Sequence, residues 1–218
     1  RSGDTLQAME AYNRVLDLPV SRFTEEALLK ASSMSYRLGN YEEAFNQYLR
    51  LEELASDKNK LLTALIGQMQ SSFLSGNYEQ AVQAAQKVLQ TKSVSSESIT
   101  DAHFIMARSY LALDKLNEAQ REFSITEKLS SNVIGAESKY QLAYLAFLMD
   151  KNIEAENLVF ELVDKYAAYD YWVARAFILL AEIYHKSGNV FQAKQTLQSV
   201  IDNYQGPELG EIAKQKLQ

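Results

Sequence analysis

The sequence contains no cysteine, little proline or glycine, and no excess of positive charge. Without cysteine there is no disulfide, no thiolate nucleophile and no cysteine-ligated metal site. Two prolines and eight glycines in 218 residues are too few for an all-β chain, which needs many tight turns. The 22 basic residues against 28 acidic ones leave a net charge of −6, so the chain lacks the basic balance of a general nucleic-acid binder.

The sequence also lacks the motifs that enzymes, metal sites and membrane spans require. Its only histidines, His103 and His185, stand 82 residues apart, far from the spacing at which a helix presents two metal ligands. No G-x-S-x-G motif and no glycine-rich phosphate loop occurs. The apolar runs are shorter than a membrane-spanning helix. We therefore predict no catalytic residues, no metal, no cofactor, no membrane span and no nucleic-acid partner.

What the sequence does contain is a repeated motif, LGNYEEA at 38–44 and SGNYEQA at 75–81. Gly39 follows an apolar-periodic run, which is where a helix ends on a residue in the left-handed conformation. Asn40 is a good cap for a following helix, and Glu43 stands where a capping box places its second partner. The motif thus predicts a helix end followed at once by a helix start. It also predicts that Asn40→Ala removes a cap, at a cost of about 1 kcal/mol.

The motif recurs through the chain at an almost constant spacing. Its turn residue is glycine or aspartate, and an alanine follows five residues later in every copy. The turn residues, which stand 36 to 38 residues apart, are Gly3, Gly39, Gly76, Asp114, Asp150 and Gly188. A period of this length is typical of a solenoid of helix pairs. An alanine facing the preceding helix allows the two helices of a pair to approach closely.

This pattern resembles the tetratricopeptide repeat family over nearly the whole chain. The family places a tyrosine in the first helix of each pair, kept here as Tyr110 and Tyr184. Its later site in the second helix holds Tyr12, Tyr48, Ala85, Phe123, Val159 and Leu197. The resemblance implies an all-α fold, an α-solenoid of antiparallel helix pairs wound as a right-handed superhelix of about 12 helices.

The repeats also predict how the chain is divided. We expect one solenoid domain over 1–218, with a partial repeat at 1–20 that lacks its first helix and a terminal helix at 207–217. Five full repeats are expected at about 25–54, 60–91, 98–129, 135–166 and 171–204. A solenoid that begins with the second helix of a pair would bare an apolar face, so we also expect further repeats upstream of Arg1.

In the family that the chain resembles, the first helix of each pair lines a concave groove. The positions that map to this groove include the polar residues Arg108 and His185 and an unusual share of aromatic residues. These aromatic residues are Tyr36, Phe73, Phe104, Tyr140, Tyr144 and Phe147. Two interpretations stay open at this point: the rings form an exposed track for a bound peptide, or they pack against the neighbouring repeat.

The function that this pattern favours is a non-enzymatic scaffold that binds a peptide or protein segment in the concave groove. The alternative is a glycan- or small-ligand-binding envelope protein that stacks its groove aromatics on sugar rings. The segments DKY at 164–166 and DNY at 202–204 are similar to repeats of bacterial outer-membrane assembly lipoproteins and Tol–Pal-associated periplasmic proteins. That similarity implies a bacterial periplasmic or cell-envelope setting.

Replacing the motif alanine by leucine tests the predicted helix packing. Ala44→Leu or Ala81→Leu should overpack the helix pair and lower the free energy of unfolding by about 1–3 kcal/mol. Urea denaturation followed by circular dichroism measures the difference. An unchanged denaturation midpoint would mean that these alanines do not face another helix.

Overall fold

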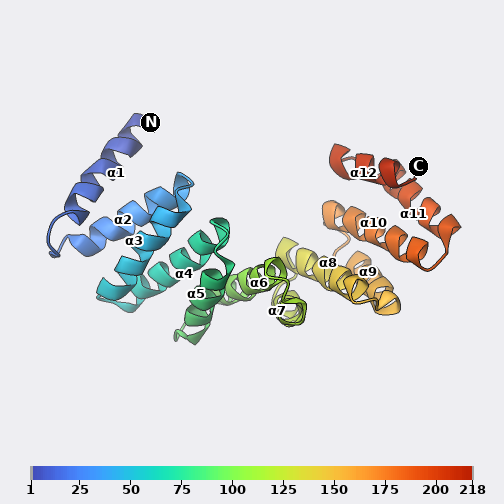
Figure 1. Ribbon diagram of the computed structural model, residues 1–218, viewed down its shortest axis with the longest axis horizontal. Helices are drawn as coiled ribbons and strands as arrows, with labels where there is room; N and C mark the ends of the chain where they lie inside the picture. Colours follow the sequence, from blue (N-terminus) through green and yellow to red (C-terminus); the bar gives the residue numbers. More distant parts are fainter. Residues whose placement is uncertain (1, 218) are drawn as a thin grey trace. The chain divides into compact units, whose positions relative to one another are not determined.

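The computed structural model describes the backbone of residues 2–217 and the side chains of residues 7–217, and in this part of the chain it contains twelve α-helices and no β-strand. The predicted all-α fold of helix pairs is confirmed. The chain divides into two compact units, residues 1–115 and 116–218. Within each unit, successive helices lie side by side and run back and forth (Figure 1). The first helix of each predicted pair is called helix A, and the second helix B.

The first unit contains α1 (Ser2–Leu16), α2 (Thr24–Arg37), α3 (Tyr41–Leu54), α4 (Lys58–Leu74), α5 (Tyr78–Gln90) and α6 (Ser96–Ala112). The second unit contains α7 (Leu116–Leu129), α8 (Val133–Leu148), α9 (Asn152–Lys165), α10 (Asp170–Lys186), α11 (Val190–Asn203) and α12 (Pro207–Leu217). Because α1 begins at Ser2, Gly3 lies inside this helix rather than in a turn before it. The two units divide within the predicted fourth repeat, 98–129, and a single domain over 1–218 stays a prediction.

The helices α2, α4, α6, α8 and α10 all end in the same main-chain turn. The turn residue has a positive φ of 57° to 82° and is Gly39, Gly76, Asp114, Asp150 or Gly188. In the first of these turns, the Gly39 N–H donates to the Tyr36 carbonyl at 3.1 Å and the Asn40 N–H donates to the Ser35 carbonyl at 2.9 Å. The other four turns repeat both hydrogen bonds. This is the Schellman motif, which glycine enters without strain and aspartate tolerates.

The prediction that Asn40 caps α3 is wrong. Its side chain accepts no hydrogen bond from the start of α3, and its ψ of 65° differs from the extended conformation of a usual cap. The Asn40 N–H is already bonded to Ser35, so it is not available to Glu43, whose carboxylate instead accepts a hydrogen bond from Gln47 Nε2 at 2.9 Å. The Asn40 carbonyl accepts the first helical bond, from the Ala44 N–H at 2.9 Å. The main chain therefore joins the two helices without help from the asparagine side chain.

Small residues set the distance between neighbouring helices. The motif alanines are buried in all five full repeats; Ala44 on α3, for example, has no exposed surface. Tyr48, also on α3, lies against Gly67 of the next helix A, where an added Cβ would stand 2.4 Å from the tyrosine ring. Interiors this closely packed tolerate little change in volume. The repeat is therefore held by small residues on both sides of helix B.

Within each unit the A helices lie on the inner side. Neighbouring A helices pack against each other, α2 with α4 and α4 with α6 in the first unit and α8 with α10 in the second, where α10 also contacts the terminal helix α12. Successive B helices are instead bridged by long side chains, as in the Lys87–Glu52 ion pair between α5 and α3, at 2.7 Å. The A helices therefore form the shorter, inner surface of each unit.

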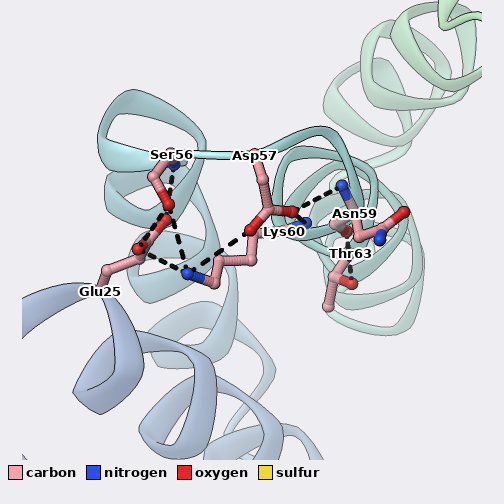
Figure 2. A network of polar contacts seen from close by, with 6 residues as sticks. All are labelled: Glu25, Ser56, Asp57, Asn59, Lys60 and Thr63. Atoms are coloured by element: carbon pink, nitrogen blue, oxygen red, sulfur yellow. Dashed lines mark hydrogen bonds and ion pairs between the residues drawn. The ribbon is translucent and has the colours of Figure 1, made fainter.

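Ion pairs join several repeats to the following element, with the acid first in sequence and the lysine 34 to 38 residues later, as in Glu25–Lys60, Glu52–Lys87 and Glu127–Lys165. The Glu25 carboxylate on α2 accepts hydrogen bonds from the Ser56 N–H at 2.6 Å and from Lys60 Nζ on α4 at 2.7 Å (Figure 2). The hydrogen bonds from Lys60 and Ser56 lower the pKa of Glu25. Glu25 and Glu52 each belong to a pair of adjacent acids in the sequence. The structure shows that these two side chains link neighbouring repeats.

Asn132 and Asn40 both precede a helix, but only Asn132 caps that helix with its side chain. Asn132 accepts a hydrogen bond from the Ile134 N–H at 2.8 Å at the start of α8, whereas Asn40 accepts none from α3. We expect Asn132→Ala to lower the free energy of unfolding by about 1 kcal/mol and Asn40→Ala to change it by less than half as much. Urea denaturation of both variants checks this; equal losses would show that Asn40 is a cap after all.

Candidate functional site

In the first unit, the predicted aromatic positions lie on successive A helices and are half-buried. The Tyr36 ring on α2 meets Tyr41 edge-on, with 5.6 Å between centroids, and Phe73 on α4 lies 5.8 Å from Tyr78. Tyr36 and Phe73 thus each pack against an aromatic residue at the start of the following helix B, α3 or α5. Tyr36 and Phe73, near the C-terminal ends of α2 and α4, are therefore partly packed and partly accessible to solvent.

Arg108 joins α6 to α4 across this inner surface. Its guanidinium carbon lies 5.0 Å from the centroid of Phe73 on α4 and 5.6 Å from that of Phe104 on α6. Arg108 is exposed while both rings are half-buried. Planar guanidinium groups stack well on aromatic faces. The structure therefore brings Phe73, Phe104 and Arg108 together as one surface, with the guanidinium near both rings.

In the second unit, the structure separates the four predicted residues. Tyr140 on α8 is buried, with 7% of its surface exposed, so for this ring the structure matches the packing interpretation, and its role in partner binding stays a prediction. Its ring packs 5.5 Å from Trp172 and lies parallel to Tyr144 at 6.4 Å, and the Arg175 guanidinium covers it at 4.7 Å. This burial raises the pKa of Tyr140. Tyr144 is half-buried beside it.

Phe147 and His185, the other two predicted residues of this unit, line one cavity of about 470 Å³ between α8, α10, α11 and α12. Phe147 is half-buried and His185 is exposed. The apolar part of the lining also includes Ala181, Val190, Ala193, Leu197 and Leu217. A cavity of this size is within the range that small ligands and single large side chains occupy.

The side chains around the Gly188 turn explain why a cavity lies beside it. In the first unit, aromatic residues stand three residues before and two residues after the left-handed glycine, as in the pairs Tyr36–Tyr41 and Phe73–Tyr78. At the turn of Gly188 the same two positions hold His185 and Val190, and both line the cavity. Smaller side chains therefore stand where two aromatic rings meet at the turns of Gly39 and Gly76.

The mouth of the cavity carries more positive than negative charge. Lys186, Lys194 and Lys216 line it, with one acid, Glu182. The Lys216 ammonium pairs with Glu182 at 2.7 Å, and Lys186 pairs with Asp150 while lying 4.9 Å from the Phe147 centroid. Lys194 is exposed and forms no ion pair within the part of the chain that the structure describes.

Sequence reasoning missed most of this cavity. It considered only the A helices, whereas Val190 and Lys194 come from a helix B and Leu217 from the terminal helix. One signal was present in the sequence. At the position of Val190, the second and third repeats have Tyr41 and Tyr78, and the loss of an aromatic residue in one repeat indicates a gap in its packing.

A second charged cluster, around Glu127, belongs to the packing between helices of the second unit. The Glu127 carboxylate on α7 is buried and accepts a hydrogen bond from Lys165 of α9 at 2.7 Å, and the buried Lys139 of α8 lies 3.6 Å away. Burial raises the pKa of Glu127, but these two lysines lower it more, so the pKa lies below its ordinary value. Among the described residues there is no cluster of metal-ligating side chains. None of their helices is long and apolar enough to span a membrane.

The comparisons with known proteins agree with the repeat architecture. Residues 175–206, which cover most of α10 and α11, match the family model of the tetratricopeptide repeat. No curated protein sequence is significantly similar to the chain.

Several solved structures, one of them described as a TPR protein, superpose on most of the chain. YrrB, described as a TPR protein with an unusual peptide-binding site, has a TM-score of 0.66 and 18% identity, covering 95% of this chain and 99% of that one. MamA from Desulfovibrio magneticus RS-1 has a TM-score of 0.66 and 14% identity, with 82% and 93% covered. BtubC from P. vanneervenii has a TM-score of 0.67 and 11% identity, with 94% and 92% covered.

These likenesses show that the chain has the fold of a tetratricopeptide-repeat solenoid. The cell-envelope setting expected from the sequence stays a prediction.

The Glu127 cluster predicts a dependence of stability on pH. Because the folded-state pKa is depressed, the contribution of Glu127 is present above its unfolded pKa of about 4.3 and is lost as the pH falls through the folded value. Glu127→Gln should therefore be less stable than the wild type at pH 7, and the difference should shrink below about pH 4.

Thermal unfolding at a series of pH values measures this effect. Glu211→Gln is the matched control, since Glu211 forms only an exposed pair with Lys214 on the same helix. A stability difference for Glu127→Gln that does not change with pH would contradict the assignment.

Proposed function

We propose that the protein is a non-enzymatic scaffold that binds a peptide or protein segment on the inner surfaces formed by its A helices. The observation that carries the proposal is the surface of Phe73, Phe104 and Arg108, which continues from one helix A to the next. A segment lying across α4 and α6 would cover both rings at once. Binding would then come from apolar burial and stacking, with no covalent chemistry.

The partial burial of these rings favours binding. A ring that is held by its own helix B, as Phe73 is held by Tyr78, loses little side-chain freedom when a partner covers it. Rigid aromatic residues and arginine are the side chains that most often dominate the free energy of protein–protein binding. Each ring that is desolvated by a partner contributes about 1–3 kcal/mol.

The solved structures support the same class of function. The description of YrrB names a peptide-binding site, and the present chain shares its fold. In the second unit, the buried charges and the packed rings join helices to one another, which is the role that they have in a scaffold.

Selection from a displayed library of random peptides tests the proposal. We expect the wild-type protein to enrich peptides with a shared pattern, and Phe104→Ala to bind the enriched peptides about ten-fold more weakly. The matched control is Leu49→Ala, because Leu49 is a partly exposed apolar residue on helix B of the same unit. Circular dichroism confirms that both variants are folded.

Failure to enrich any peptide, or equal losses in the two variants, would contradict the proposal. Calorimetry with oligosaccharides accompanies the selection. Heat of binding to sugars without peptide enrichment would favour the alternative ligand-binding function predicted from the aromatic positions.

A further inference from the structure

We propose that the cavity of the second unit, lined by Phe147, Val190, Leu197 and Leu217 and rimmed by Lys186, Lys194 and Lys216, seats one apolar side chain of an acidic peptide segment. This inference rests on the proposed peptide-binding function and specifies a partner class for one site. The acidic residues of the segment would flank the apolar one and meet the lysines at the mouth.

The interior of the cavity fits an apolar side chain and offers little to a polar one. Ala181, Ala193 and Leu197 are buried and form its floor, and Val190, with 47% of its surface exposed, leaves apolar area uncovered at the wall. The volume of about 470 Å³ exceeds that of any single apolar side chain. A leucine or phenylalanine therefore enters without requiring the helices to move.

The charges at the mouth select the flanking residues. Three lysines face one glutamate there, although the whole chain has a net charge of −6. Lys216 and Lys186 are already paired with Glu182 and Asp150, so their charge is partly compensated. Lys194, exposed and without an ion pair among the described residues, is the cation most available to a ligand carboxylate. A basic segment would be repelled by Lys194 and would have to compete with Lys216 and Lys186 for Glu182 and Asp150.

The rim also orients the segment. Lys186 and Lys194 stand eight residues apart, on the end of α10 and on α11, and Lys216 reaches the mouth from α12. A carboxylate on one side of the seated residue can therefore meet Lys194, and one on the other side can share Lys186 or Lys216 with its present partner. A peptide with acids on both sides of a leucine should bind better than one that has acids but no large apolar residue.

Fluorescence anisotropy with short dye-labelled peptides tests the inference. The probe has one leucine between aspartates and glutamates, and the comparison peptides replace the acids by lysines or the leucine by glycine. We expect the probe to bind the full chain at least about ten-fold more tightly than either comparison peptide. Raising the salt concentration should weaken binding of the probe.

The decisive variant is Lys194→Glu, which changes the rim without removing a structural partner. We expect it to weaken binding of the probe about ten-fold. Lys128→Glu is the matched control, because Lys128 is exposed on α7, does not line the cavity and gives the same change in net charge. A second variant, Val190→Ser, should weaken binding of the probe about five-fold, because it removes apolar surface from the wall of the cavity.

The outcomes separate this inference from the proposed function. Equal binding of the acidic and basic peptides, or equal effects of Lys194→Glu and Lys128→Glu, would overturn the inference. If the library selection still enriches peptides that depend on Phe104, the scaffold function stands without this site. If the selection enriches no peptide and the probe does not bind, both proposals are wrong.

Discussion

The structure depends on one main-chain turn of three residues between helix A and helix B, whose middle residue is left-handed. Five copies of the turn, from Gly39 to Gly188, reverse the chain within three residues. Their hydrogen bonds use the main chain alone, so the side chain after the turn residue is free to vary between asparagine and lysine. The turn brings the motif alanine of helix B against the preceding helix, and burial of that alanine sets the separation within the pair.

The arrangement of helix pairs determines which surface is available for binding. Because A helices pack against A helices within each unit, Phe73 near the end of α4 and Phe104 in the middle of α6 form one surface under Arg108. Aromatic positions of the A helices serve packing where neighbouring residues are large, as at Tyr140, which Trp172 and Arg175 cover. They leave a cavity where neighbouring residues are small, as at His185 and Val190. Local side-chain size thus decides whether a repeat contributes to the core or to a site.

The sequence was a good guide to the helix pairs and a partial guide to the site. The turn residues and the alanines could be predicted because backbone conformation and small size are local requirements. The missing cap at Asn40 could not, since the turn holds Asn40 at a ψ of 65°, away from the extended conformation in which an asparagine side chain caps a helix. The burial of Tyr140 and the cavity beside Phe147 depend on residues from other helices, Trp172 and Leu217 among them. No single repeat contains that information.

Chemical-shift mapping by nuclear magnetic resonance tests the central claim most directly, that each unit binds ligands on the inner surface formed by its A helices. The account predicts two possible sets of shifted amide signals when a peptide binds. One set lies on α4 and α6 of the first unit, and the other lies on α10, the terminal helix α12 and the start of α11 in the second. Shifts confined to the outer faces of α3, α5, α7 and α9 would contradict it.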